Sequence, residues 1–259
     1  MSFITVQGRQ IEVVRLPSAH PKDGYPSIVF LHEGLGSVAM WRDFPQQVAD
    51  ATGCEAVVYS RYSYGKSSPL EKPHEVDYMH REGLDALPEL LDKLALDKPI
   101  LFGHSDGASI ALINAGGTPR PLTGVIVMAP HVIVEDICIT SIEAAKVAYD
   151  DPQTRLRERL AKFHADVDSA FRGWNDIWLH PQFRFFNIEE YLPRIACPVL
   201  AIQGEDDEYG TMDQIERIAR QAKDVELVKL ADCRHSPHKD QPAAVLEEVR
   251  AFVERLCNP

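Results

Sequence analysis

The stretch Pro99-Ile-Leu-Phe-Gly-His-Ser-Asp-Gly-Ala-Ser-Ile-Ala-Leu112 decides the fold. A short apolar run leads into Gly103-His-Ser-Asp-Gly107, and a helix-like segment follows. This is the pattern Gly-x-Ser-x-Gly between a strand and a helix, the setting of a nucleophile elbow. A serine at so sharp a turn has a strained backbone, and the residues two positions away pack against it. Gly103 and Gly107 lack side chains that would collide there, so the pattern predicts an exposed Ser105 hydroxyl at the positive end of a helix.

Ser105 has a second interpretation, because serine is also a common N-cap of helices. The five residues alone therefore leave Ser105 open between a nucleophile and a structural cap. A short motif is a hypothesis until its structural context agrees with it. The rest of the chain has to supply that context, as an order of strands and as partners for the hydroxyl.

Length and composition indicate an ordinary globular protein. The chain has 259 residues, of which 45% are hydrophobic and 25% charged. This length fits one α/β domain, or a core with a small inserted domain. The formal net charge of −12 argues against nucleic acid and anionic membrane surfaces as partners, since both need a basic face. A small-molecule substrate is the expected partner, but the net charge says nothing firm about it, because a local pocket can differ from the average. The oligomeric state stays open.

The cysteines and the chain start indicate a compartment. The five cysteines are widely spaced and form no Cys-x-x-Cys pair, so we expect free thiols in a reducing compartment. The first ten residues show no basic-then-apolar signal pattern. No apolar run approaches the roughly 20 residues of a membrane span. The expectation is a soluble, cytoplasmic protein.

Apolar runs alternate with helix-like segments along most of the chain. Continuous apolar runs are typical of strands buried on both faces of a parallel sheet, and the alternation predicts an α/β fold with helices on both faces of a mostly parallel central sheet. A polar, aromatic and helix-like region interrupts it, which predicts an insertion over 131–194 and a core of 1–130 and 195–259. The expected elements are a hairpin of 3–6 with 11–16, strands at 27–31, 54–59, 100–102, 123–129, 197–203 and 225–230, and helices at 41–52, 79–94 with a kink at Pro88, 108–115 and 243–256.

A serine hydroxyl needs a base to take its proton and an acid to orient that base. In this architecture the acid and then the histidine follow the serine along the chain. The acid is expected in Gly204-Glu-Asp-Asp-Glu-Tyr-Gly210, directly after a strand, where α/β sheets place their sites. Asp207 is preferred, because three residues after Gly204 the chain has cleared the strand, and Asp206 is the alternative. The rest of this segment is a solvated acidic turn.

The base is expected directly after the last strand, where two histidines compete. His235 is closer to the strand end, and its loop leads into the final helix, so it is preferred over His238. The oxyanion needs two backbone donors. The elbow supplies the N–H of Asp106, and the loop after strand 27–31 supplies a second, from Gly34 or from Leu35.

With these residues in place, the chain resembles the α/β-hydrolase superfamily over essentially its whole length. The resemblance rests on Gly103–Gly107, the turn from Gly204 to Asp207, His235 before Pro242, the His32-Glu-Gly loop and the stretch Arg61-x-x-x-Gly-x-Ser67. It implies the α/β-hydrolase fold, with 131–194 as a helical cap over the active site. These motifs identify the superfamily but not the substrate.

Several residues depart from the superfamily pattern or suggest a pocket. Many members have glycine where this chain has Glu33, which either recognises a polar or cationic group or faces solvent. His131 follows a core strand, and Trp174 and Trp178 belong to the aromatic cap, so all three are candidate substrate-binding residues or core residues. A metal site from His131, Glu135, Asp136 and His164 lacks a known ligand spacing, and no metal is expected.

The leading functional hypothesis is a cofactor-free serine hydrolase that cleaves carboxylic esters of a small or medium, apolar or aromatic substrate. In it Ser105 attacks the carbonyl, His235 acts as base and then as acid, and Asp207 orients His235. The alternatives are a carbon–carbon bond hydrolase, an acyltransferase or perhydrolase with the same triad, and a hydrolase-like ligand receptor. Asp106 stands where carbon–carbon hydrolases often carry Met, so the sequence favours the carbon–carbon hydrolase less than the ester hydrolase.

Overall fold

A computed structural model describes residues 1–258 of the chain. Its centre is an eight-stranded sheet in the order β1-β2-β4-β3-β5-β6-β7-β8. The strands are β1 (Ser2–Val6), β2 (Arg9–Leu16), β3 (Ile28–Leu31), β4 (Ala56–Tyr59), β5 (Ile100–His104), β6 (Gly124–Met128), β7 (Val199–Gly204) and β8 (Val225–Leu230). The first two strands pair antiparallel as a hairpin, β2 runs antiparallel to β4, and all other pairs are parallel. The predicted fold class is confirmed.

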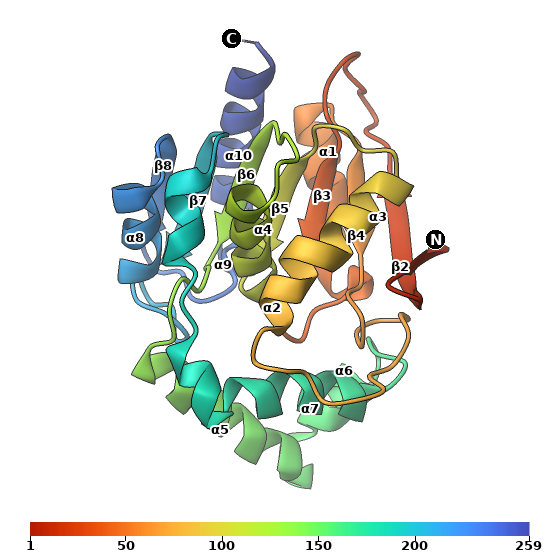
Figure 1. Cartoon of the computed structure of the whole chain (residues 1–259), viewed down its shortest axis with the longest axis vertical. Coiled ribbons are helices and arrows are strands. Elements are labelled where there is room, and N and C mark those ends of the chain that lie inside the picture. Colours follow the sequence, from red (N-terminus) through yellow and green to blue (C-terminus); the bar gives the residue numbers. More distant parts are fainter. Residues whose placement is uncertain (259) are drawn as a thin grey trace.

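Helices cover both faces of this sheet (Figure 1). On one face η1, α1 and α10 bury Trp41, Phe44, Val249 and Phe252 against β3, β5 and β6. The other face lies under α2, α3, α4 and α8. The core helices are η1 (Val38–Trp41), α1 (Phe44–Thr52), α2 (Tyr78–Arg81), η2 (Glu82–Ala86), α3 (Leu87–Lys93), α4 (Asp106–Gly117), α8 (Asp213–Gln221), α9 (Pro237–Asp240) and α10 (Pro242–Cys257).

The helix predicted over 79–94 is divided into three pieces. A turn of π-helix, η2, separates α2 from α3, and Pro88 lies in the first turn of α3. Pro88 has no N–H to donate to the preceding turn, so one helical hydrogen bond is missing there. The wider π-helical turn just before it accommodates the missing bond. The sequence prediction missed α8, because only Ile215 and Ile218 form its apolar stripe.

Between β6 and β7 the chain makes only helices and one isolated bridge, from Ile133 to Asn187. The helices α5, α6 and α7 lie together at one end of the sheet, the lower end in Figure 1. The last piece, η5, returns to the core and packs against α4, where Tyr191 meets Gly116. The bounds in this region are α5 (Asp136–Asp150), η3 (Pro152–Thr154), α6 (Leu156–Leu160), α7 (Val167–Trp178), η4 (Pro181–Phe185) and η5 (Glu189–Arg194).

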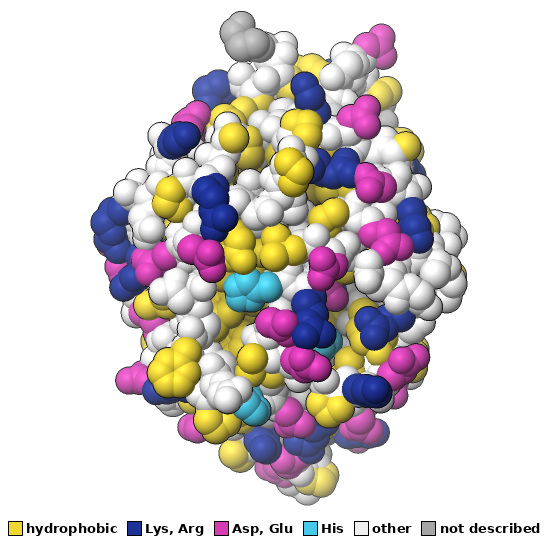
Figure 2. Space-filling model, viewed as in Figure 1, with side chains coloured by type: hydrophobic (Ala, Val, Ile, Leu, Met, Phe, Trp, Pro, Cys, Tyr) yellow, Lys and Arg dark blue, Asp and Glu magenta, His cyan; other side chains and the backbone are white. Residues whose placement is uncertain are grey.

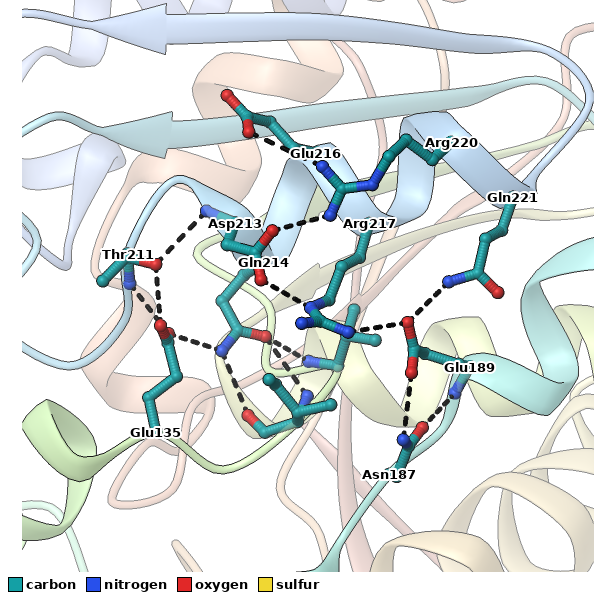
Figure 3. A network of polar contacts seen from close by, with 12 residues as sticks. Glu135, Asn187, Glu189, Thr211, Asp213, Gln214, Glu216, Arg217, Arg220 and Gln221 are labelled. Atoms are coloured by element: carbon teal, nitrogen blue, oxygen red, sulfur yellow. Dashed lines mark hydrogen bonds and ion pairs between the residues drawn. The ribbon is translucent and has the colours of Figure 1, made fainter.

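Both ends of this helical insertion are held by α8 (Figure 3). At the first end, the buried Gln214 side chain accepts from Val132 N–H at 2.6 Å and donates to the Glu135 carboxylate at 2.6 Å. At the second end, Arg217 donates to the Glu189 carboxylate at 2.9 Å. A single helix of the core therefore fixes where the chain enters and where it leaves the insertion.

The surface carries charge of both signs. On the face shown in Figure 2, Lys and Arg side chains are interspersed with Asp and Glu, and no basic patch forms. Within residues 1–258, every helix is too short or too polar to cross a lipid bilayer.

The first prediction tests the packing at the elbow. A Cβ atom on Gly107 would overlap the backbone of Leu31 in β3, whereas one on Gly173 in α7 would meet side-chain ends alone, those of Leu70 at 3.2 Å and His74 at 3.4 Å. We expect Gly107→Ala to lower the free energy of unfolding by about 2 kcal/mol or more, and Gly173→Ala to change it by less than about 1 kcal/mol. Urea unfolding measures both, and equal stabilities of the two variants would contradict the packing argument.

Candidate active site

Ser105 lies between β5 and α4 in a strained conformation, with φ 53° and ψ −118°. It occupies the N-cap position of α4, but its side chain makes no capping hydrogen bond. The Ser105 Oγ lies instead 2.9 Å from Nε2 of His235. The structural-cap interpretation therefore does not account for the hydroxyl, and such strain in a non-glycine residue is typical of functional sites.

Asp207 and His235 complete a chain of hydrogen bonds with Ser105. His235 Nδ1 lies 2.8 Å from Asp207 Oδ1. A carboxylate only accepts, so Nδ1 carries the proton and Nε2 of the neutral ring accepts from the Ser105 hydroxyl. Asp207 also accepts from the Tyr209 N–H at 2.8 Å and from the Gln203 amide at 3.2 Å.

The environment keeps Asp207 ionised. Burial acts to raise the pKa of this carboxyl, but the hydrogen bond and charge of His235 and the Tyr209 N–H outweigh burial, and the pKa lies below its usual value. An ionised Asp207 fixes the tautomer of His235 that leaves Nε2 free to accept a proton.

The two alternative residues lie elsewhere. Asp206 has an exposed side chain. His238 is buried, with ring centroids 5.0 Å from Trp41 and 5.4 Å from Phe44, and burial lowers its pKa to about 2. Neither side chain hydrogen-bonds Ser105 or His235, so the structure favours Asp207 and His235 over them.

The turn after β3 presents two free backbone donors. The Glu33 carbonyl accepts from His32 Nδ1 at 2.6 Å, from Arg61 at 3.0 Å and from the Gly36 N–H at 3.0 Å. In a trans peptide the following N–H points the opposite way, so the Gly34 N–H faces away from Arg61. Gly34, Leu35 and Asp106 all line the cavity at Ser105, and among the described residues no protein acceptor takes the N–H of Gly34 or Leu35.

His32 and Arg61 hold this turn, and sequence reasoning did not assign them a role. The Arg61 N–H donates to Nε2 of His32 at 2.9 Å, so the proton of His32 is on Nδ1, as its bond to Glu33 requires. Burial, and then the charge of Arg61, holds the pKa of His32 well below its usual range. The neutral ring is therefore a fixed spacer between two loops. The sequence signal was present in the His32-Glu-Gly loop and in Arg61, which were noted only as motifs.

The side chain of Asp106 is buried and joins the core to the insertion. It accepts from the Tyr78 hydroxyl at 2.7 Å and from the Trp178 indole at 3.2 Å, and Arg61 lies 3.6 Å away. Burial raises the pKa of Asp106, while the charge of Arg61 and the two donors oppose it. The Trp178 bond places α7 directly over the elbow. Tyr78 and Arg61 were missed as its partners, although a carboxylate beside a buried turn requires donors.

A cavity of about 180 Å³ lies at Ser105, between the core and the insertion. The candidate residues Glu33, His131, Trp174 and Trp178 all line it. His131 is buried with its ring centroid 5.0 Å from that of Trp178, and burial lowers its pKa to about 3. The lining residues not singled out from the sequence are Cys138, Ile142, Glu208, Tyr209 and Ser236.

Two of the residues considered as metal ligands, His164 and Glu135, make other hydrogen bonds. His164 accepts from the Gly65 N–H at 3.0 Å and donates to the Leu35 carbonyl at 3.0 Å. Glu135 accepts from Thr211 and Gln214. Within residues 1–258 no group of three His, Cys, Asp or Glu side chains is arranged to hold a metal ion. His164 instead ties the insertion to the turn that carries Gly34 and Leu35.

Comparison with known proteins gives consistent matches. The sequence profile of the alpha/beta hydrolase family matches residues 28–248. Human serine hydrolase BPHL is 23% identical over 70% of this chain, a match that spans 63% of that protein. Proline iminopeptidase of Saccharolobus solfataricus is 22% identical, over 98% of this chain and 96% of that one. The structure of the enol-lactonase from Burkholderia xenovorans LB400 superposes with a TM-score of 0.75 and 17% identity, covering 97% of this chain and 99% of that one, which is a likeness of fold.

The pH dependence of stability tests the Asp207–His235 contact. An unfolded aspartate titrates near pH 3.9, and the lowered pKa of Asp207 means that its contribution to stability is present above that pH and is lost as the pH falls through the folded pKa. We expect the wild type to be more stable than Asp207→Asn at pH 5, and the difference to shrink as the pH falls below about 3.9 and through the folded pKa of Asp207. Urea unfolding at several pH values measures this. Asp206→Asn, the exposed control, should show no such trend, and a constant difference for Asp207→Asn would contradict the assignment.

Proposed function

Since the chain belongs to the alpha/beta hydrolase family, we propose that it is a serine hydrolase that cleaves carboxylic esters through an acyl-enzyme on Ser105. The observation that carries the proposal is the hydrogen-bonded chain from Ser105 Oγ to His235 at 2.9 Å and from His235 to Asp207 at 2.8 Å. A serine becomes a nucleophile when a base within this distance takes its proton. The three residues come from three separate loops, so their contact is not a consequence of sequence proximity.

In the first half-reaction His235 Nε2 takes the proton of the Ser105 hydroxyl while Oγ attacks the ester carbonyl. The carbonyl oxygen becomes an oxyanion, which accepts from the Asp106 N–H and from the Gly34 or Leu35 N–H. The positive end of α4 lies behind the same point and favours the negative charge. The tetrahedral intermediate then collapses, and the protonated His235 gives its proton to the leaving alcohol.

In the second half-reaction water replaces the alcohol. His235 takes a proton from the water, whose oxygen attacks the acyl-enzyme carbonyl, and the same donors stabilise the second oxyanion. Collapse of this intermediate releases the carboxylic acid, and His235 returns the proton to Ser105. Asp207 remains ionised throughout and stabilises each imidazolium as it forms.

The cavity supports a small, uncharged substrate. A cavity of about 150 Å³ accommodates a benzene ring, so a space of about 180 Å³ suits a short acyl or a single aryl group. Leu35, Ile142, Trp174 and Trp178 supply apolar walls. Among the described lining residues the ionisable groups include the carboxyls of Glu33, Asp106 and Glu208 but no lysine or arginine, so a carboxylate on the substrate would lack a partner and meet repulsion.

The nucleophile assignment predicts that Ser105→Ala loses activity. We expect its kcat on an aryl ester such as 4-nitrophenyl acetate to fall by at least about 10³-fold, and labelling by a fluorophosphonate to disappear. Ser109→Ala, one turn further along α4, is the matched control and should retain labelling. Wild-type turnover by Ser105→Ala would disprove the proposal.

The charge of the lining predicts discrimination between matched esters. We expect phenyl acetate to be hydrolysed with a kcat/KM at least about tenfold higher than that of 4-carboxyphenyl acetate, because a desolvated carboxylate near like charges costs more than 1.4 kcal/mol, the equivalent of about tenfold. 4-Acetylphenyl acetate controls for ring substitution. Equal kcat/KM for the acid and the neutral ketone would contradict this part of the proposal.

A further inference from the structure

A second histidine lies behind the proposed triad. His104, the last residue of β5, is fully buried, and its Nε2 is 2.7 Å from the carbonyl oxygen of His235. A carbonyl only accepts, so Nε2 of His104 carries a proton and donates it. The two rings lie side by side, with centroids 5.3 Å apart. His104 therefore holds the backbone of His235, the base of the proposed mechanism, by a hydrogen bond.

The other ring nitrogen of His104 faces Glu33. His104 Nδ1 lies 3.6 Å from Glu33 Oε2, and Lys239 Nζ lies 3.6 Å from Glu33 Oε1. The Glu33 side chain is only 17% exposed. Burial acts to raise its pKa, but His104 and then Lys239 outweigh burial, and the pKa of Glu33 lies well below its usual value. The carboxylate is therefore ionised, and it faces the histidine rather than open solvent.

Space for this carboxylate is made by Gly36. A Cβ atom on Gly36 would overlap Glu33 Oε2 and crowd the His32 side chain. Gly36 also donates its N–H to the Glu33 carbonyl, which closes the turn that presents the N–H groups of Gly34 and Leu35. Glu33 thus has its backbone in the oxyanion turn and its side chain beside His104, the histidine that binds the His235 carbonyl.

We propose that Glu33 and His104 form a second carboxylate–histidine pair, which positions the oxyanion turn and the general-base loop relative to each other; this rests on the proposed serine hydrolase function. Both are positioning residues, because neither touches the reacting atoms. Glu33 holds the turn through its backbone. Its carboxylate, 3.6 Å from His104 Nδ1, attracts and orients His104 when Nδ1 carries a proton in addition to the one on Nε2. His104 in turn fixes the His235 carbonyl. A small displacement of a catalytic group costs large factors in rate, so such a link affects turnover.

The charge of Glu33 adds an electrostatic effect. His235 becomes positive in each half-reaction, and a nearby negative charge stabilises it. Removal of that charge disfavours protonated His235, so the acid limb of kcat/KM moves to lower pH. The charged and titratable groups that face the pair are Lys239 and His238 from α9, His32 beside the turn, His164 from the insertion, and His131. Those that face His235 are Asp207, Glu208 and Tyr209 from the acidic loop, with His131 and Asp106.

The test compares Glu33→Gln with Asp206→Asn, which removes the same unit of charge from an exposed position of the neighbouring acidic loop. For Glu33→Gln on a neutral aryl ester we expect kcat to fall by about tenfold or more, KM to change by less than about twofold, and the acid limb of kcat/KM to move down by about half a pH unit. Asp206→Asn should match the wild type in all three. Gly36→Ala, which keeps the charge but displaces the carboxylate, should lower kcat without moving the acid limb.

His104 is tested by rescue. Glutamine keeps an N–H donor near the position of Nε2, so we expect His104→Gln to retain at least about fivefold more activity than His104→Phe. Melting temperatures show whether each variant folds. If His104→Phe does not fold, the Glu33→Gln measurement alone tests the proposal. A Glu33→Gln enzyme with only a raised KM would make Glu33 a substrate-binding residue, and one identical to Asp206→Asn would remove its role; either result overturns the inference. Full activity of Ser105→Ala would instead reject the underlying hydrolase function.

Discussion

The structure depends on the close packing around one strained residue. Ser105 has φ 53° because β5 and α4 meet there without a linking loop. Side chains at Gly103 and Gly107 would overlap α4 and β3, so the strain is sustained only where both neighbours are glycine. Such strain costs about 1–3 kcal/mol and persists only when the surrounding packing over-determines it. The sheet, and above all β3 beside β5, provides that packing and so sets where the hydroxyl points.

A second constraint links this elbow to the insertion. Arg61 and Asp106 form a buried ion pair at 3.6 Å, and removing either partner would leave an unpaired buried charge, which costs about 3–5 kcal/mol. Arg61 also holds the Glu33 carbonyl, and Asp106 also accepts from Trp178 of α7. The same buried charges thus orient the oxyanion turn and seat the insertion above it. The substrate pocket and the backbone donors of the oxyanion turn are therefore held by the same network, that of Arg61 and Asp106.

Much of this arrangement could be predicted from the sequence, for physical reasons. Gly-x-Ser-x-Gly alone leaves two interpretations of Ser105, but the order of buried strands determines which loops share an edge of the sheet with it. The structure brings Ser105, Asp207 and His235 into contact as that order predicts, while their catalytic roles stay a proposal. Pro88 indicated a kink in helix 79–94, but the turn of π-helix before it and the existence of α8 were not predicted, because a π-turn leaves no periodic signal and α8 fully buries only two apolar residues.

The contacts made by Glu33, His104 and Arg61 could not be read from the sequence either, since each depends on loops that converge only in three dimensions. Their arrangement indicates why the site tolerates an acidic residue where the resemblance to the superfamily leads us to expect glycine. A carboxylate at residue 33 needs attractive neighbours and free space. His104 Nδ1 and Lys239 Nζ each lie 3.6 Å from its oxygens, and Gly36 leaves it room. Without all three, burial would push the proton back onto Glu33 or drive its side chain into the pocket. The departure at Glu33 is therefore part of a set of residues that acts on the geometry of the site.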